Sequence, residues 1–374
     1  MKAVFDREAL LHAFQTVSGV VPSRPVRPVL ANGKLVVESD RAVLAATDLD
    51  AVGIRYEIRG VQVRQPGVVL APCHQTASIL KEMPDQEITL TGDEQRCVIE
   101  GSASEFEVPS EDPAQYPDVP SWQGENYHQI AAGVLRELIT RTAFAAAVEG
   151  ARYALNGVMW ELGPERFRLV ATDGRRLAVA DAVGIMHGKH STESQTPVVP
   201  TKAMTLIERS LTDPEEQVFV AFGPNEVLVK TSRAEVYGRL VEGRFPPYKE
   251  VFPKKHTARV KLTAGPFLAA IRQAATISDP ESRGVSFAFG KGKVTLSSVA
   301  SQAGRAKVEM PLEYDGKALQ IAFDPRFLTD MLRVLEPDSE LTLDLLDENS
   351  PALFRVGESY QYIVMPLARS SAGS

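Results

Sequence analysis

The stretch 170-VATDGRRLAV-179 consists of two short apolar runs separated by an Asp-Gly turn and two arginines. Asp-Gly between runs of β-branched and small apolar residues predicts two antiparallel strands joined by a tight turn. The turn itself needs only Asp173 and Gly174, so the two arginines and the leucine after them require a separate explanation. The stretch 44-LAATDLDAVG-53 is an imperfect copy of the same pattern. This duplication indicates that the chain contains internal repeats.

Four kinds of segment recur three times in the same order along the chain. They are an amphipathic helix running into a strand, a pair of strands, a strand running into a second helix, and a closing pair of strands. Pro-rich and polar stretches around 116–129 and 244–260 are typical of linkers between such units. Alternation of apolar and polar residues in the strands leaves one sheet face for the helices to cover. The sequence therefore predicts an α+β protein of three repeated helix–sheet domains, at 1–122, 127–252 and 257–374.

Composition limits the classes of protein to which the chain can belong. It has 374 residues, of which 44% are apolar and 24% charged, as in a globular protein with ample core. No run approaches the ~18–20 apolar residues of a membrane span, and the opening MKAVFDREALLHAF lacks the apolar region of a signal peptide. Cys73 and Cys97 form no metal-like pair, which favours a reduced, cytoplasmic protein.

The charge distribution leaves room for a local basic surface. The net charge of −7 argues against a protein whose whole surface binds nucleic acid. The predicted helices together carry nine basic and seven acidic residues, whereas the rest of the chain is strongly acidic. That difference is consistent with weak contacts between the helices and DNA phosphates, without sequence preference. It is equally consistent with ordinary amphipathic helices that have charged residues on the solvent-exposed face. The helices are predicted at 6–18, 72–83, 131–147, 200–211, 264–277 and 324–335.

Signs of catalysis are weak. Asp48 and Asp173 could serve as metal carboxylates and DGRR as a phosphate clamp, but the six histidines are scattered through the sequence. There is no P-loop, no Gly-rich dinucleotide fingerprint and no serine nucleophile elbow. The residues therefore favour a non-catalytic protein that needs no cofactor and no metal. A repeat scaffold that binds only other proteins stays open as an alternative.

Three motifs carry a resemblance to a known family. The stretches 171-ATDGRRLA-178, 243-GRFPPYKEVFP-253 and 362-YIVMPL-367, together with the three repeats, resemble the bacterial DNA sliding clamp, the beta subunit of DNA polymerase III. The resemblance implies a head-to-tail homodimer whose six domains close a ring around duplex DNA, with helices inside and sheets outside. It implies a processivity factor that tethers the polymerase III catalytic subunit, the clamp loader, and other polymerases and repair proteins. These partners would bind through short hydrophobic linear motifs, and no membrane is involved.

The resemblance assigns the TDGRRL segment to a pocket for partner peptides between the second and third domains. From the residues alone, the arginines could instead be solvated beside a turn, but the first repeat has Leu49-Asp50 in place of Gly-Arg and the third has no aspartate. Departures from the family pattern at Glu250, Ser282 and Phe327 leave the peptide preference open. The expected pocket residues are Leu155, Thr172, Gly174, Arg175, Arg176, Leu177, Pro246, Val251, Phe327, Ile363, Val364, Met365, Pro366 and Leu367.

Two further sets of residues follow from the same resemblance. Positions that match DNA-facing ones in the family are Arg24, Arg152, Tyr153 and Lys202, although loop arginines can also be merely solvated. Positions that match the joint between subunits are Phe106, Thr276 and Ile277, although burial in the core of a domain would explain Phe and Ile equally well. Pairing of exposed sheet edges across subunits would give hydrogen-bond partners to the free backbone groups of both edges.

Overall fold

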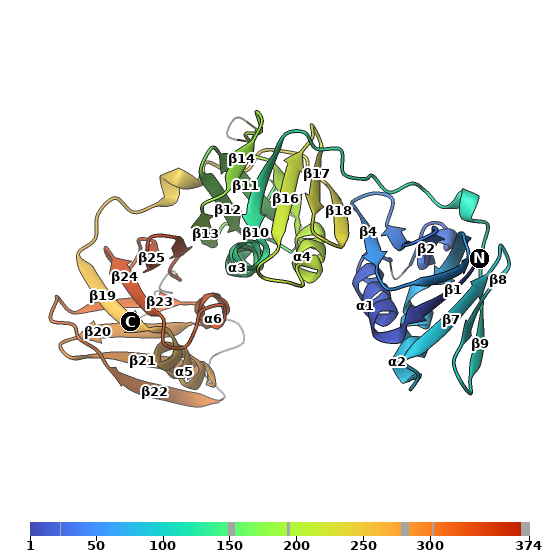
Figure 1. Ribbon diagram of the computed structural model, residues 1–374. Coiled ribbons are helices and arrows are strands. Elements are labelled where there is room, and N and C mark those ends of the chain that lie inside the picture. The colour runs from blue at the N-terminus through green and yellow to red at the C-terminus, as the bar shows by residue number, and fades with distance from the viewer. Residues whose placement is uncertain (23, 149–153, 193–194, 278–283, 301–302, 368–374) are drawn as a thin grey trace. The chain divides into compact units, whose positions relative to one another are not determined.

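The computed structural model describes residues 1–22, 24–148, 154–192, 195–277, 284–300 and 303–367 (Figure 1). Contacts group the chain into two compact units. The first unit comprises 1–136, 162–165 and 184–241, and the second comprises 137–161, 166–183 and 242 onward. Both units combine antiparallel sheets with helices, so the chain has the predicted α+β character.

The first unit contains a sheet of five strands, in the order β5-β1-β7-β8-β9, and a sheet of nine, in the order β14-β10-β16-β17-β18-β4-β3-β2-β6. Helices α1 and α2 lie side by side against strands of this unit (Figure 1). The strands are β1 (Lys2–Asp6), β2 (Asn32–Val37), β3 (Ala42–Thr47), β4 (Val52–Ile58), β5 (Gln62–Gln65), β6 (Gly67–Pro72), β7 (Glu87–Gly92), β8 (Arg96–Glu100), β9 (Glu105–Pro109), β10 (Tyr127–Ala131), β14 (Ile185–His187), β15 (Val198–Pro200), β16 (Gln217–Phe222), β17 (Glu226–Lys230) and β18 (Ala234–Arg239). The helices are α1 (Arg7–Ser18), α2 (Cys73–Glu82) and α4 (Thr201–Ser210), and α3 (Ala132–Thr142) begins here.

The second unit contains a sheet in the order β11-β12-β13-β26-β25-β24-β19 and a four-stranded sheet in the order β22-β21-β20-β23. Helices α5 and α6 lie side by side (Figure 1). The strands are β11 (Gly157–Gly163), β12 (Arg166–Thr172), β13 (Arg176–Ala182), β19 (Ala258–Thr263), β20 (Val285–Gly290), β21 (Lys293–Ala300), β22 (Gly304–Pro311), β23 (Leu319–Phe323), β24 (Glu340–Leu345), β25 (Ala352–Val356) and β26 (Tyr360–Val364). The helices are α5 (Ala264–Ala275) and α6 (Pro325–Arg333).

Strands from successive repeats pair at two places. In the first unit, β4 pairs with β18 and sets Ile54 opposite Val236. In the second unit, β13 pairs with β26 and sets Leu177 opposite Ile363. Each pairing covers two strand edges that would otherwise be exposed. The repeats are thus joined through continuous sheets.

The helices form where their sequences provide both a buried stripe and a start signal. In α1, the Asp6 side chain accepts a hydrogen bond from the backbone N–H of Ala9 at 2.8 Å, and Leu10 and Phe14 are fully buried. Helix α6 starts in the same way at Asp324, with a proline in its first turn. The helix bounds agree with the sequence prediction to within one or two residues, except in the third helix.

The third helix was predicted over 131–147 but ends at Thr142 and is followed by the short 3-10 helix η3 (Ala143–Ala145). Two backbone groups beyond Thr142 bond to other segments. The carbonyl of Phe144 accepts from Arg176, and the N–H of Ala147 donates to Leu155. These groups cannot continue an α-helical ladder, so the helical sequence pattern overestimates the length of the helix.

Candidate functional site

The TDG turn is held by its own side chains. The hydroxyl of Thr172 donates to the carbonyl of Arg176 at 2.6 Å, and the Asp173 carboxylate accepts from the N–H groups of Arg175 and Arg176. Gly174 has a φ of +88°, a left-handed conformation that suits glycine. The geometry is that of an Asx turn closing a β-hairpin.

The first repeat builds the same turn with one more residue. The hydroxyl of Thr47 donates to the carbonyl of Val52, and the Asp48 carboxylate accepts from the N–H groups of Ala51 and Val52. Leu49 takes the left-handed conformation there, with a φ of +74°. The turn therefore does not require the Gly-Arg-Arg-Leu sequence of the second repeat, which leaves those residues available for another role.

Arg176 connects the turn to two other elements. Its guanidinium donates to the carboxylates of Asp173 and Asp330, at 3.0 and 2.7 Å, and to the carbonyl of Phe144 at 2.8 Å. The same group lies 4.8 Å from the centroid of the Phe327 ring. Its side chain is only 11% exposed. Arg176 is therefore a buried cross-link, held by charge-assisted hydrogen bonds on three sides.

Arg175 lies at the surface and has a different environment. Among the described residues, no hydrogen bond or ion pair of its side chain is found, and its carbonyl accepts the N–H of Met365 at 2.8 Å. That backbone bond holds the segment after β26 against the turn. The free cation at this site is thus Arg175 rather than Arg176.

These elements surround an apolar pocket of about 360 Å³, which lies within the second unit. Its floor includes the buried Leu155, Leu177 and Ile363. Two large apolar side chains at the pocket stay partly exposed, Val251 at 42% and Met365 at 38%. A concave apolar site with exposed anchors of this kind is typical of a surface that binds a ligand or a peptide. The lining residues are Leu155, Thr172, Gly174, Arg175, Arg176, Leu177, Pro246, Pro247, Tyr248, Glu250, Val251, Ile363 and Met365.

A buried polar network holds the linker wall of the pocket, the 3-10 helix η4 (Tyr248–Val251). Glu161 accepts from the Tyr248 hydroxyl at 3.0 Å and from Lys249 at 2.7 Å, and Arg168 donates to the same hydroxyl at 3.2 Å. Arg168 is in turn fixed by two hydrogen bonds to Asp181. Burial raises the pKa of Tyr248 to about 12, so its hydroxyl stays neutral and donates to Glu161. The network thereby positions the neighbouring Glu250 and Val251 at the pocket.

The structure brings together ten of the fourteen residues that the sequence assigned to this pocket. The other four do not line it. Phe327 packs against the guanidinium of Arg176, Val364 is fully buried opposite Arg176 in the sheet, and Leu367 bonds through its N–H to Ala322. Pro366 lies between the lining residue Met365 and Leu367. Sequence reasoning missed the linker residues Pro247 and Tyr248 as pocket residues and related Glu250 only to peptide preference, although the GRFPPYKEVFP motif contains all three.

Arg24 and Lys202, two of the residues assigned to DNA, lie in the first unit. Arg24 is exposed, and no partner of its side chain is found among the described residues. The ammonium of Lys202 donates to Asp48 at 2.7 Å and to the carbonyl of Val20 at 3.2 Å, which brings α4 to the loop that contains Arg24. Lys202 thus forms an ion pair with Asp48 and is not a free cation. Arg152 and Tyr153 lie outside the described residues, as does Ser282.

The residues assigned to the joint between subunits lie near free sheet edges. Phe106 is 38% exposed on β9, the last strand of the five-stranded sheet. Thr276 is exposed and Ile277 half-buried, directly after α5. Helix α5 contacts β22, the last strand of the four-stranded sheet. Burial in a domain core therefore does not explain Phe106.

Comparison with known proteins gives matches along the whole chain. Residues 1–120, 129–247 and 249–368 match the N-terminal, central and C-terminal domain models of the DNA polymerase III beta subunit. The beta sliding clamp of Pseudomonas putida is 30% identical over 98% of this chain and 100% of its own length. The chain belongs to the bacterial DNA sliding clamp family.

Other clamps agree with this assignment. The beta sliding clamp of Caulobacter vibrioides is 32% identical, again over 98% of this chain and its own full length. A crystal structure of the Pseudomonas aeruginosa sliding clamp with ligand has a TM-score of 0.88 at 30% identity, covering 98% of this chain and all of the other. The Bacillus subtilis clamp, at 24% identity and a TM-score of 0.90 over 99% and 100%, has the same fold.

Membership of the family establishes the clamp fold and the role of a replication processivity factor. The clamp is accordingly a non-catalytic accessory subunit of DNA polymerase III and not an enzyme. In the described ranges, no helix is both long and apolar enough to cross a membrane. Within the same ranges, no group of three His, Cys, Asp or Glu side chains is placed to hold a metal ion.

Proposed function

We propose that this clamp works as a cytoplasmic homodimeric ring that encircles duplex DNA, slides without sequence preference and holds partner proteins by a peptide in the pocket beside the TDG turn. The observation that carries the docking part is the pocket itself. Apolar side chains line it, two anchors stay partly exposed, and buried polar networks fix its walls. A preorganised apolar pocket binds a short hydrophobic motif at low entropic cost.

The internal symmetry of the chain supports the ring. Each repeat has two halves, and each half consists of a helix and strands. At both joints, the last strand of the first half of one repeat pairs with the last strand of the second half of the next repeat. These pairs are β4 with β18 and β13 with β26. The two equivalent strands that remain are β22, the last strand of the first half of the third repeat, and β9, the last strand of the second half of the first repeat. Each of them lies at the end of its sheet. Pairing β22 of one chain with β9 of a second chain repeats the same joint and closes a head-to-tail dimer.

Charge on these two edges is complementary. Strand β9 carries Glu105 and Glu107, and β22 carries Arg305 and Lys307, followed by Glu309, which pairs with Lys293 and Lys307. Opposite charges across an antiparallel pair stabilise it, whereas pairing of β9 with a second β9 would bring carboxylates together. Phe106, Thr276 and Ile277 would supply the apolar part of this interface.

The rim of the pocket suggests which partner peptides it accepts. Arg175 stands at the rim as a free cation, and the exposed Glu250 lines the same pocket. A peptide with apolar anchors and an acidic residue near Arg175 would satisfy this arrangement. The Pseudomonas aeruginosa clamp has been solved bound to griselimycin, a ligand-bound relative at 30% identity. We place the partner site of this chain in the ten assigned residues that line the pocket together with Pro247, Tyr248 and Glu250.

We assign DNA contact to side chains that reach the phosphates, not to side chains that read the bases. Arg24, Arg152, Tyr153 and Lys202 are the proposed contacts, with Arg24 as the free charge and Lys202 shared with Asp48. Contacts to phosphates position a duplex without reading its sequence, which sliding requires. The proposed domains are 1–122, 127–252 and 257–374.

Retention on DNA tests the proposal. The clamp is loaded onto a nicked circular plasmid by its clamp loader and separated from free protein by gel filtration in high salt. A ring held topologically stays on the circle and leaves when a restriction enzyme linearises it, because salt weakens only the electrostatic contacts. Release from the intact circle at the same rate as from the linear form would contradict encirclement.

A further inference from the structure

The three repeats differ at one edge of their sheets. In each repeat the first strand runs directly into the first helix, as β1, β10 and β19 do. Strand β1 pairs on its outer side with β5, and β10 pairs on its outer side with β14. Strand β19 ends its sheet, and among the described residues no strand pairs with its other side. The third repeat thus leaves open an edge that the other two fill from their own chain.

The filled positions correspond in register. Counting back from the helix start, Lys2, Tyr127 and Arg259 are equivalent, and so are Val4, Gln129 and Lys261. The added strands lie opposite residues 2–4 in the first repeat and 127–129 in the second. The open position in the third repeat is therefore opposite residues 259–261.

The segment that could fill this edge is held elsewhere. Leu312 donates its N–H to the carbonyl of Gly292, and Gly292 donates its N–H to the carbonyl of Tyr314. The side chains of Leu312 and Tyr314 are buried in this arrangement. Pro311 also has no N–H to donate to a ladder. The chain after β22 therefore belongs to the β20–β21 turn and leaves β19 uncovered.

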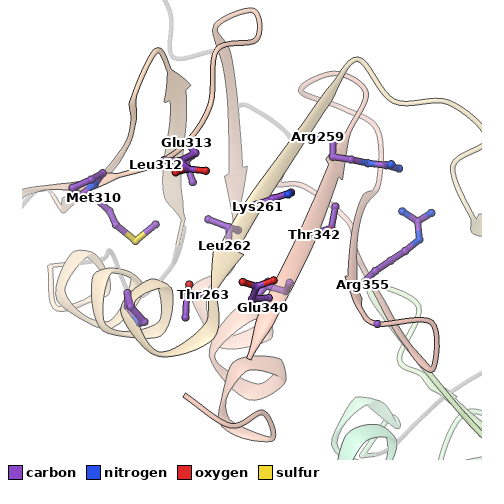
Figure 2. A pocket seen from close by; sticks show the side chains of 14 residues that line it. Arg259, Lys261, Leu262, Thr263, Met310, Leu312, Glu313, Glu340, Thr342 and Arg355 are labelled. Atoms are coloured by element: carbon purple, nitrogen blue, oxygen red, sulfur yellow. The ribbon is translucent and has the colours of Figure 1, made fainter. Parts of the chain in front are cut away.

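A groove of about 840 Å³ lies along the open edge, within the second unit. Figure 2 shows β19 with Lys261 and Leu262 between Thr342 on one side and Met310 and Leu312 on the other. The cavity is within the range of sites that hold peptides or small ligands, about 300–1,000 Å³. The groove therefore reaches the side chains of β19.

The outward side chains at the open position are basic. Arg259 and Lys261 are exposed, whereas Val260 between them is fully buried. Arg259 and Arg355 share the buried carboxylate of Asp344, and no partner of the Lys261 ammonium is found among the described residues. This end of the groove therefore has one carboxylate for three cations. Figure 2 shows the carboxylates of Glu313 and Glu340 elsewhere in the groove.

The first and second repeats show which side chains a strand added at this edge presents to its neighbour. Its middle residue is apolar and half-buried, Val63 opposite Ala3 in the first repeat and Met186 opposite His128 in the second. Its outward residues contact the neighbouring strand, as in the stacked rings of Tyr127 and His187, 4.6 Å apart. An added strand opposite β19 would therefore place an apolar residue against Val260 and two outward residues against Arg259 and Lys261.

We propose that the open edge of β19 is a second docking site, at which an extended segment of a partner protein adds as an antiparallel strand with an acidic–apolar–acidic pattern. Backbone hydrogen bonds provide the affinity, and the cross-strand carboxylates provide the specificity. A second copy of this edge would bring its own lysine and arginine and would be repelled. The occupant is therefore a partner segment that carries carboxylates. The site is separate from the pocket at Met365 and does not depend on the function proposed for that pocket.

The probe is a fluorescein-labelled hexapeptide, Thr-Glu-Val-Glu-Val-Thr, with blocked ends, titrated with the full-length protein in an anisotropy assay. The comparison peptide has lysine at both glutamate positions. We expect the glutamate peptide to bind at least ~10-fold more tightly than the lysine peptide. Two further glutamate peptides carry N-methyl groups on alternate residues, odd or even. Only one set of N–H groups faces β19, so one isomer retains binding and the other loses it.

Protein variants locate the site. Lys261→Glu is expected to weaken the glutamate peptide ~5-fold or more and to strengthen the lysine peptide, whereas Lys81→Glu on α2 changes neither. Met365→Ala is also expected to leave this binding unchanged. Hydrogen exchange of the β19 amides should slow when the glutamate peptide is bound. The proposal is overturned if neither peptide binds at millimolar protein, if both N-methylated isomers bind equally, or if Lys261→Glu has no effect.

Discussion

At the scale of single residues, two adjacent arginines have different tasks. Arg176 is a buried cross-link between the turn, Asp330 and the carbonyl of Phe144, whereas Arg175 is exposed at the pocket rim. The sequence places them side by side and gives no reason to separate them. Which of two adjacent side chains is buried depends on the pairing of β13 with β26, a contact between segments nearly 200 residues apart.

Arg176→Ala is expected to lower the free energy of unfolding by about 2 kcal/mol, because Asp173 and Asp330 lose a buried partner. Affinity for a partner peptide should fall as well, since the turn is no longer fixed. Arg175→Ala is expected to leave the unfolding temperature unchanged and to weaken an acidic peptide two- to fivefold. Thermal unfolding and peptide anisotropy measure both effects. Equal destabilisation by the two variants would show that the cross-link is misassigned.

Met365→Ala removes an apolar side chain that is 38% exposed at the pocket. The partner peptide should bind about 10-fold more weakly, as expected when an interface anchor is truncated. Stability should change by less than ~0.5 kcal/mol, as is usual at a surface position. Unchanged peptide affinity in this variant would place the docking site elsewhere.

At the scale of elements, two buried histidines hold β10 and the strands beside it. Nδ1 of His128 lies 2.6 Å from Nδ1 of His190, whose Nε2 accepts the N–H of Phe222 at 2.9 Å. His128 Nε2 lies 2.8 Å from the carbonyl of Gly163 and donates to it. These contacts require neutral His190 protonated on Nδ1. Burial and the nearby His128 lower the pKa of His190 to about 4, and burial also lowers the pKa of His128.

Stability should therefore fall as pH decreases from about 6.5 to about 4. In that window the unfolded chain binds protons that the folded protein excludes, so the free energy of unfolding decreases, by about 2 kcal/mol in total. His190→Gln is expected to flatten this part of the pH dependence, whereas His74→Gln at the surface keeps it. Urea unfolding at several pH values measures the slope. A wild-type slope that survives in His190→Gln would contradict the assignment.

In the proposed dimer, the edge strands β9 and β22 meet across the two subunits. Arg305→Glu combined with Lys307→Glu leaves five carboxylates, Glu309 included, and no cation in the proposed β9–β22 pair, and should weaken the dimer at least ~10-fold. Lys291→Glu, a single charge reversal on the neighbouring turn, serves as the control and should leave the dimer intact. Sedimentation velocity across a dilution series measures the change. A dimer unaffected by the double change would rule out this pairing.

Sequence reasoning predicted local elements better than distant contacts. Apolar periodicity predicted the helices, and the caps that the structure shows at Asp6 and Asp324 are equally local interactions. The end of the third helix depends on Phe144 bonding to Arg176, which lies 32 residues away. In the pocket, the motifs predicted the turn, the linker and the C-terminal strand. The network that presents Glu250 was missed because Glu161 and Arg168 lie in ordinary strand sequence.

At the scale of the whole molecule, the net charge of −7 and the cations proposed to face DNA must coexist. Combined Arg24→Glu and Lys202→Glu should reduce loading onto DNA at low salt and make it less steeply dependent on salt, because fewer phosphate contacts release fewer counterions. Clamps already closed on a circle should stay, since a ring is held mechanically. Loading assays at several salt concentrations test this. Full loading at all of them would remove both residues from the DNA interface.

Small-angle X-ray scattering of the purified protein, without ligand, tests the central claim that two chains form a hollow ring. A ring of two chains has a mass of two 40.8 kDa chains and the pair-distance distribution of a hollow particle. A monomer at micromolar concentration, or a dimer with a filled centre, would contradict it.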